Sequence, residues 1–287
     1  MKFTPRQNTF DALLPSEMAV RAEQIGVEKT RQDTLSLLAL AVLAGAFIAF
    51  GAMFSTIVTA GADGVLPFGV IRLLAGLTFS LGLILVIVGG AELFTGNNLM
   101  VMAYAAGKVS AGDIVRAWAL VYAGNLIGAV GVAFLFYATG GYTHGNGTIG
   151  LAALAVGQSK ASLSAYQELI HGILGNILVC LAVWLCYSAR TVADKILAIV
   201  PPISAFVAAG FEHSIANMYL LPFAILVKNG APDAFWAATG KTAQTFPSVT
   251  FFDSLTNLVM VTAGNMLGGV MVGVTYWFIY LRKRGTQ

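Results

Sequence analysis

The sequence predicts an all-α membrane protein: six transmembrane helices in an inverted 3+3 repeat, with helices two and five broken. Three observations support this fold class: an apolar composition, six long apolar runs, and two similar polar interruptions in corresponding runs. Apolar residues make up 57% of the 287 residues and charged residues only 10%, against about 25% charged residues in an average soluble domain. A soluble globule of this size could not cover its surface with so few charges.

The composition also excludes several classes of function. The net charge is only +3, so no strong basic field exists to hold nucleic acid. The two cysteines, Cys180 and Cys186, share one apolar run, and we interpret them as packing residues. The three histidines are scattered without a ligand cluster, so we expect no metal. No HExxH motif, catalytic Ser–His set or cofactor fingerprint occurs, so we expect neither an enzyme nor a cofactor.

The first 34 residues form a polar segment of mixed charge. It has no small-residue cleavage site after a short apolar core, so it does not resemble a signal peptide. Its pattern predicts a short amphipathic helix along the membrane surface, beginning near Pro15 or Ser16. We therefore divide the chain into an N-terminal segment (1–34), a six-helix transmembrane domain (35–281) and a tail (282–287).

Six apolar runs are long enough to cross a bilayer, which takes about 20 apolar residues. They cover 35–60, 68–104, 113–138, 165–189, 195–227 and 254–281. The second and fifth runs are too long for one simple crossing. Each also holds glycines and polar residues in its middle, at 89–98 and at 210–217. We predict that these two helices are broken inside the membrane.

Basic residues assign the two sides of the membrane. Most of them lie in the N-terminal segment, after the second and fourth spans and in the tail, at Lys2, Arg6, Arg21, Lys29, Arg31, Lys108, Arg116, Arg190, Lys195, Arg282, Lys283 and Arg284. The opposite side has Lys160, Lys228 and Lys241, and Arg72 lies near the outer start of the second span. Both termini are therefore expected in the cytoplasm.

The two interruptions resemble each other. The pattern Gly-x-Glu-x-x-x-x-Asn occurs at Gly90–Asn97 and again at Gly210–Asn217. A second shared pattern occurs in the third and sixth spans, at Ala123–Gly128 and Ala263–Gly268. Because each half has three spans, the second half enters the membrane from the opposite side. Inverted repeats of this kind occur in many transport proteins, and interrupted helices in corresponding positions indicate a substrate site.

A helix broken at mid-membrane offers a new N-terminus whose free N–H groups and positive dipole end favour an anion. We expect Glu92 and Glu212 to accept hydrogen bonds from backbone N–H groups exposed at the breaks, with proton handling or ion coordination as the alternative. His213 departs from the repeat, since Leu93 matches it in the first half. An ionisable residue at this depth predicts function, here a hydrogen bond or a proton for an anion.

Two further polar positions leave alternatives open. Thr95 offers a hydroxyl either to a small anion or to the loop backbone as a cap. Asn125 and Asn265 lie within the third and sixth spans, where polar side chains usually bond to other helices or to exposed backbone. A pore-facing orientation of these asparagines is the alternative.

The two interruptions, Glu92–Asn97 and Gly210–Met218, resemble the two signature segments of the formate/nitrite transporter family. The similarity covers nearly the whole chain, and its flanking segments look most like the formate-channel branch. These segments are Phe10–Pro15, Pro67–Gly69, Phe79–Leu85, Val179–Trp184 and Thr275–Arg282.

The resemblance implies an aquaporin-like protomer, a homopentamer with one pore per protomer, and a place in the inner membrane. It implies a central histidine at His213 with a loop threonine at Thr95, and matches Glu212 and Asn265 to that histidine's surroundings. It further implies a cytoplasmic constriction at Phe79, Leu83 and Leu93, a periplasmic constriction at Val179 and Phe206 with Asn176 nearby, and a vestibule lysine at Lys160.

We therefore predict a pH-dependent channel for formate and related small monovalent anions, with a proton possible through His213. Nitrite or hydrosulfide remains an alternative, because Glu92 and Gly96 stand where a formate channel has Asp and Ser. An intramembrane enzyme using Glu92, Glu212 and His213 is a second alternative. A water or neutral-solute channel is a third, although the paired Asn-Pro-Ala repeats of aquaporins do not occur.

Overall fold

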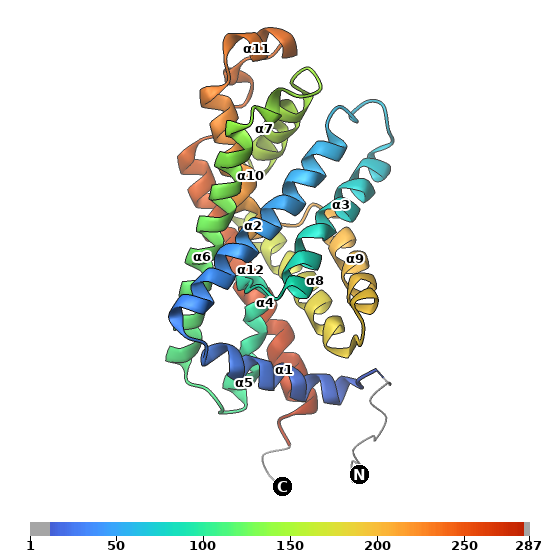
Figure 1. Ribbon diagram of the computed structural model, residues 1–287, viewed down its shortest axis with the longest axis vertical. Coiled ribbons are helices and arrows are strands. Elements are labelled where there is room, and N and C mark those ends of the chain that lie inside the picture. Colours follow the sequence, from blue (N-terminus) through green and yellow to red (C-terminus); the bar gives the residue numbers. More distant parts are fainter. Residues whose placement is uncertain (1–11, 284–287) are drawn as a thin grey trace.

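The computed structural model describes residues 12–283, and every regular element in that range is a helix (Figure 1). Among these described residues, five helices are long and apolar enough to cross a membrane. They are α2 (Thr34–Thr59), α3 (Phe68–Gly89), α6 (Ala111–Ala138), α8 (Ala165–Ser188) and α12 (Phe251–Tyr280). The fifth predicted crossing is divided between α9 (Val192–Ala208) and α10 (Ser214–Gly230). Each has only 17 residues, which is the expected consequence of a break.

Both predicted breaks are present. Helix α3 ends at Gly89 and is followed by Gly90, with φ 78°. The chain continues in α4 (Phe94–Asn97), η1 (Asn98–Met100) and α5 (Val101–Ala105). Helix α9 is followed by Gly210, with φ 76°. Glycine adopts this left-handed conformation without the penalty that a Cβ imposes. The prediction of an all-α membrane protein with broken second and fifth helices is confirmed.

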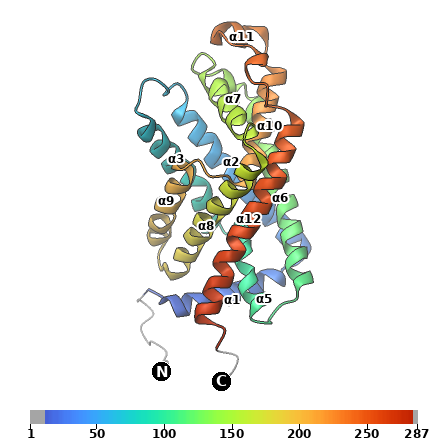
Figure 2. The same cartoon turned by 180° about the vertical axis from the view of Figure 1, so that it is seen from behind.

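The two halves of the chain run in opposite senses. In Figure 1, α2, α3 and α6 run up, down and up, whereas α8, α9 with α10, and α12 run down, up and down. Helix α2 packs against α3 and α6, and α8 packs in the same way against α9 and α12. Figure 2 shows α12 beside α8 on the reverse side. Helices α3 and α9 pack together where the halves meet.

Glycines let the partner helices in each half approach closely. A Cβ on Gly124 of α6 would lie 2.5 Å from the Cβ of Ala41, and a Cβ on Gly128 would overlap the carbonyl oxygen of Val42. In the second half, a Cβ on Gly268 would overlap the carbonyl oxygen of Ile173. The repeated pattern in the third and sixth spans therefore marks the same backbone contact in both halves.

Helix α2 begins at Thr34 because Asp33 caps it. The Asp33 carboxylate accepts hydrogen bonds from the backbone N–H groups of Ser36 (3.0 Å) and Leu35 (3.1 Å). The bond from Ser36 contributes most to lowering the pKa of the Asp33 carboxyl below its ordinary value. The α2 start lies close to the predicted boundary at residue 35.

Shorter helices cover the two ends. Helix α1 (Pro15–Thr30) lies across the end where α12 finishes (Figure 1). At the opposite end lie α7 (Thr148–Ala161), α11 (Asp233–Thr239), η2 (Gly141–Thr143) and η3 (Ala243–Thr245). The sequence predicted a helix beginning near Pro15 but not α7, which packs against α10 and carries Lys160 in its last turn. The predictions for residues 1–11 and 284–287 lie outside the described residues.

Replacing Gly128 with alanine should destabilise the protein, because the new methyl group would overlap the backbone of α2. We expect a loss of about 1–3 kcal/mol, measured as a lower Tm of the detergent-solubilised protein. Gly131→Ala is the matched control on the same helix, since nothing lies within 4 Å of its added Cβ. Equal Tm values for the two variants would contradict the close packing of α2 and α6.

Candidate functional site

The first break is held together by Asn125 of α6. Its Oδ1 accepts a hydrogen bond from the backbone N–H of Phe94 at 2.9 Å. Its Nδ2 donates to the carbonyl oxygens of Ala41 (2.7 Å) and Glu92 (2.9 Å). One buried side chain thus satisfies three backbone groups, two of them released where α3 stops, each of which would otherwise be costly inside a membrane.

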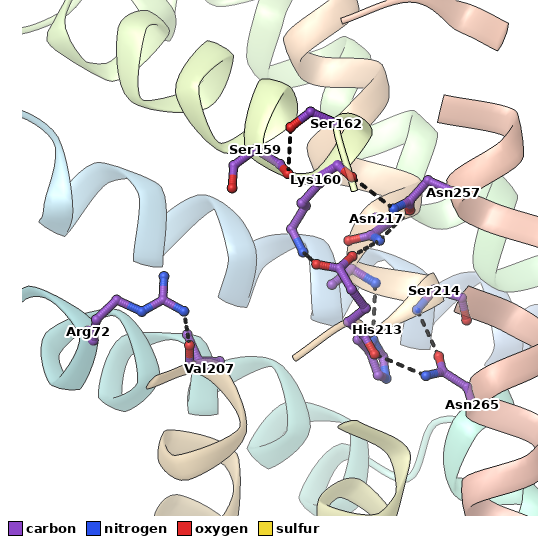
Figure 3. Close-up of polar contacts among 12 residues, drawn as sticks. Arg72, Ser159, Lys160, Ser162, Val207, His213, Ser214, Asn217, Asn257 and Asn265 are labelled. Atoms are coloured by element: carbon purple, nitrogen blue, oxygen red, sulfur yellow. Dashed lines mark hydrogen bonds and ion pairs between the residues drawn. The ribbon is translucent and has the colours of Figure 1, made fainter. Parts of the chain in front are cut away.

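The second break is held in the same way by Asn265 of α12. Its Oδ1 accepts from the backbone N–H of Ser214 at 2.9 Å, and its Nδ2 donates to the carbonyl oxygens of Gly172 (2.8 Å) and Glu212 (3.0 Å). Figure 3 shows Asn265 reaching from α12 towards the segment that contains His213 and Ser214. The expectation that these asparagines bond to exposed backbone is confirmed.

The carboxylate of Glu92 has different partners from those expected. Its Oε2 binds the Lys29 ammonium of α1 at 2.5 Å and accepts from the Asn97 amide at 2.8 Å. The expectation of backbone N–H partners is wrong for this residue. The backbone at the break is already paired: Asn125 binds Phe94 N, and the Glu92 N–H donates to the carbonyl of Leu40 at 3.2 Å.

The carboxylate of Glu212 repeats this arrangement at the opposite side. Its Oε1 accepts from the Lys160 ammonium at 2.8 Å, and its Oε2 accepts from the Asn217 amide at 2.6 Å. The Asn217 amide also donates to Asn257 of α12 at 2.7 Å, as Figure 3 shows. The expectation of backbone partners is therefore wrong here too. The Glu212 backbone N–H is paired with the carbonyl of His171 instead.

His213 caps the first turn of α10 and faces Thr95 from the other half of the chain. Its Nδ1 accepts the backbone N–H of Ala216 at 3.1 Å, and its Nε2 lies 2.8 Å from the Thr95 hydroxyl oxygen. Because Nδ1 is an acceptor, the proton of the neutral ring is on Nε2, which donates to Thr95. His213 is 2% exposed and Thr95 0%. The hydroxyl of Thr95 therefore meets the imidazole rather than capping the loop.

The five apolar site residues are all buried, and two of them contact each other. The ring of Phe79 lies against the ring of Phe206, with centroids 5.9 Å apart. Phe206 in turn lies 6.0 Å from the His213 ring. The contact between Phe79 and Phe206 joins one residue from each expected constriction, and the two constrictions themselves stay a prediction. The other three residues, Leu83, Leu93 and Val179, are at most 3% exposed.

Asn176 of α8 connects the two halves near this centre. Its amide nitrogen donates to the carbonyl oxygens of Thr95 (3.3 Å) and Asn265 (2.6 Å). Its Oδ1 is buried and has no hydrogen-bond partner among the described residues. A buried amide oxygen of this kind favours a donor from outside the protein, such as water or a protonated solute.

Sequence reasoning missed the lysine of the first half. Lys29 lies on α1, far along the chain from Glu92, and the sequence carried no signal for the pair beyond the presence of basic residues. The asparagines that complete both carboxylate sites did carry a signal. Asn97 and Asn217 end the repeated pattern that begins with Gly90 and Gly210.

Comparison with known proteins agrees with this geometry. The family profile described as Formate/nitrite transporter matches residues 16–278. The formate channel FocA of Escherichia coli (strain K12) is 44% identical over 278 residues, covering 96% of this chain and 97% of FocA. The formate channel FocA of Haemophilus influenzae (strain ATCC 51907 / DSM 11121 / KW20 / Rd) is 36% identical over 265 residues, 92% of this chain and 93% of that protein.

A solved structure, described as a pentameric formate channel with formate bound, also matches. It shares 44% sequence identity and a TM-score of 0.82, and the match covers 87% of this chain and 98% of that one. The chain is therefore a membrane protein of the channel and transporter class. It belongs to the formate/nitrite transporter family.

Replacing Lys160 with methionine should destabilise the protein, because the Glu212 carboxylate would be left buried without its cation. Removing one partner of a buried ion pair costs about 3–5 kcal/mol. The double variant Lys160→Met/Glu212→Gln should recover most of that loss, as measured by thermal unfolding in detergent.

Lys228→Met provides the matched control, because among the described residues the Lys228 ammonium binds only the carbonyl oxygens of Phe246 and Val249. Removing this ammonium leaves no buried carboxylate without a cation, so the loss of stability should be smaller than in Lys160→Met. A double variant that is no more stable than Lys160→Met would contradict the role of the ion pair.

Proposed function

We propose that this chain forms a channel for formate and related small monovalent anions. We place it in the inner membrane with both termini in the cytoplasm, as a homopentamer with one pathway per protomer and no enzymatic activity. The observation that carries the proposal is the buried contact between His213 and Thr95, made between the two broken helices. The relatives named as formate channels support formate as the anion.

The pathway in this proposal runs past apolar side chains on either side of His213. In this proposal Phe79, Leu83 and Leu93 form the constriction on the side of α1. Val179 and Phe206 form the constriction on the outer side. These side chains cannot replace the water around an anion, so a hydrated or larger ion is excluded, and a charge in this region is expensive. Crossing as the neutral acid removes most of that cost.

The geometry of His213 favours a hydrogen-bond donor over a proton donor. Its Nδ1 is occupied by the N–H of Ala216, so a second proton on the ring would break the cap of α10. In this proposal Nε2–H leaves Thr95 and donates to the anion, and the hydroxyl of Thr95 donates beside it. The positive N-terminal end of α10 adds to the attraction.

Replacing His213 with phenylalanine should abolish formate flux while pentamers still form, because the substitution removes both the donor and the cap. His213→Asn is the control, since an asparagine side chain can cap a helix and donate a hydrogen bond without titrating. We expect it to retain flux within about one order of magnitude of the original protein. The measurement is formate uptake into proteoliposomes, with the pentamer checked by native mass spectrometry.

Flux in His213→Phe equal to that of the original protein would refute the role of this residue. A pH dependence that persists in His213→Asn would place the titrating step on the anion, whereas its loss would place that step on the imidazole.

Formate uptake should be faster than nitrite uptake, and both should rise when the external solution is made acidic, because acid increases the fraction of neutral species. Parallel uptake into proteoliposomes at an acidic and a neutral pH measures this. The recovered solute should be chemically unchanged, which distinguishes a channel from an enzyme. Faster nitrite than formate would assign the chain to the nitrite branch. Osmotic swelling without anion uptake would favour a water channel.

A further inference from the structure

A buried carboxyl group near the end opposite to α1 takes no part in the site described above. Glu168 lies in the first turn of α8 and is 2% exposed, and its Oε2 has no hydrogen-bond partner among the described residues. We propose that Glu168 is a proton-binding residue that controls the entry of anions from this outer end. When Glu168 loses its proton, the added negative charge repels the anion. The inference rests on the proposed function.

The repeat shows that the fold does not require a polar residue at this position. The asparagines that close the two breaks bind the carbonyl oxygens of Ala41 and Gly172, which makes these two positions equivalent. Glu168 precedes Gly172 by four residues, as Leu37 precedes Ala41. Leu37 is 0% exposed, so the first half fills the same place with an apolar core side chain. A carboxyl group here departs from the repeat, as His213 does.

The neighbour of Glu168 on α12 departs from the repeat in the same way. Asn257 stands where the first half has Ala117, eight residues before the closing asparagine in each case. Its amide faces the Glu168 carboxyl as a hydrogen-bond donor, and it also donates to the carbonyl oxygen of Lys160 at 3.3 Å. Glu168 and Asn257 therefore form a polar pair that the first half lacks.

A chain of hydrogen bonds connects this pair with the second break, and Figure 3 shows most of its members. The Asn217 amide donates to Asn257 at 2.7 Å and to Glu212 at 2.6 Å. The Glu212 carboxylate in turn binds the Lys160 ammonium at 2.8 Å. Because buried charges are screened much less than exposed ones, a charge on Glu168 acts on an anion at the outer end of the proposed pathway.

In the described part of the chain, no ion pair joins Glu168 to a cation. The ammonium of Lys160 is bound by Glu212, and the other carboxyl group that faces Glu168 is Asp253 of α12. The next titratable residue along α8 is His171. Its ring lies against the aromatic ring that precedes Glu212, with centroids 6.1 Å apart. The surroundings of Glu168 therefore supply more negative than positive charge.

These surroundings make Glu168 a site for a proton. A buried carboxylate without a cation is costly, so the group takes up a proton instead. Glu212 and Asp253 oppose a further negative charge beside them. The N-terminal end of α8 favours the charged form, but a helix end contributes less than the burial of an unpaired charge costs. Loss of the proton in alkaline solution changes the buried cluster of Lys160, Glu212 and Glu168 from neutral to negative.

The test compares formate uptake by a variant and by the original protein as a ratio, which removes the titration of formate itself. Proteoliposomes are sorted by the accessibility of an N-terminal tag so that the α1 end faces the lumen. The internal pH is fixed and the external pH is stepped from acidic to alkaline. Glu168→Gln is neutral at every pH. Its uptake rate divided by that of the original protein should be near one in acid and rise about three- to tenfold in alkaline solution.

The protonation of Glu168 is measured separately by infrared spectroscopy of the purified protein. The spectrum of the original protein minus that of Glu168→Gln should contain the C=O stretch of a protonated carboxyl group in acid. This band should disappear over the pH range in which the uptake ratio rises. A residue with a purely structural role would not link the two measurements.

Three variants act as controls. Glu168→Asp keeps a titratable carboxyl and should keep the fall in uptake that the original protein shows in alkaline solution. Glu168→Leu introduces the residue that the first half has, and it should behave as Glu168→Gln does, so the test does not depend on one substitution folding. Asp233→Asn removes an exposed carboxylate of α11 at the same end. Its uptake ratio should not change with pH.

The inference would be overturned by an uptake ratio that does not change with external pH in both Glu168→Gln and Glu168→Leu, or by a ratio that falls as the pH rises. Absence of the carboxyl band from the difference spectrum at every pH would overturn it as well. Absence of formate uptake by the original protein would instead refute the proposed function, so the two failures are distinguishable.

Discussion

The structure depends on the hydrogen bonds by which Asn125 and Asn265 close the two helix breaks. A helix that stops inside a membrane releases backbone groups that neither lipid nor water can satisfy there. Each asparagine binds one released N–H and two carbonyl oxygens, and its own amide is consumed in doing so. The backbone at each break is then fixed, so that the Thr95 and His213 side chains can contact each other.

The two halves use this common scaffold but differ at two positions, and the difference creates the polar centre. Leu93 in the first half corresponds to His213 in the second, and Thr95 corresponds to Ile215. Each half therefore contributes one polar and one apolar residue, and the two polar groups meet at 2.8 Å. A strictly symmetric pair of breaks would give either two histidines or two threonines.

The sequence predicted the crossings, the breaks and the repeat because these follow from composition and periodicity along the chain. It also singled out His213 by its departure from the repeat. It could not predict that Lys29 and Lys160 pair with the two glutamates, since these lysines lie on α1 and α7, and α7 has no apolar pattern that distinguishes it from a loop. The grouping of Phe79 with Phe206 likewise depends on how α3 and α9 pack, which no local pattern records.

The buried ion pairs have a consequence for the energetics of an anion in this protein. Glu92 and Glu212 lie beside the breaks. As free carboxylates they would repel an anion in the proposed pathway near His213. Pairing each with a lysine removes the net charge, so an anion near His213 meets hydrogen-bond donors and helix dipoles instead of a fixed ion. A full positive charge there would bind the anion too tightly to release it, and conduction requires binding weak enough to leave.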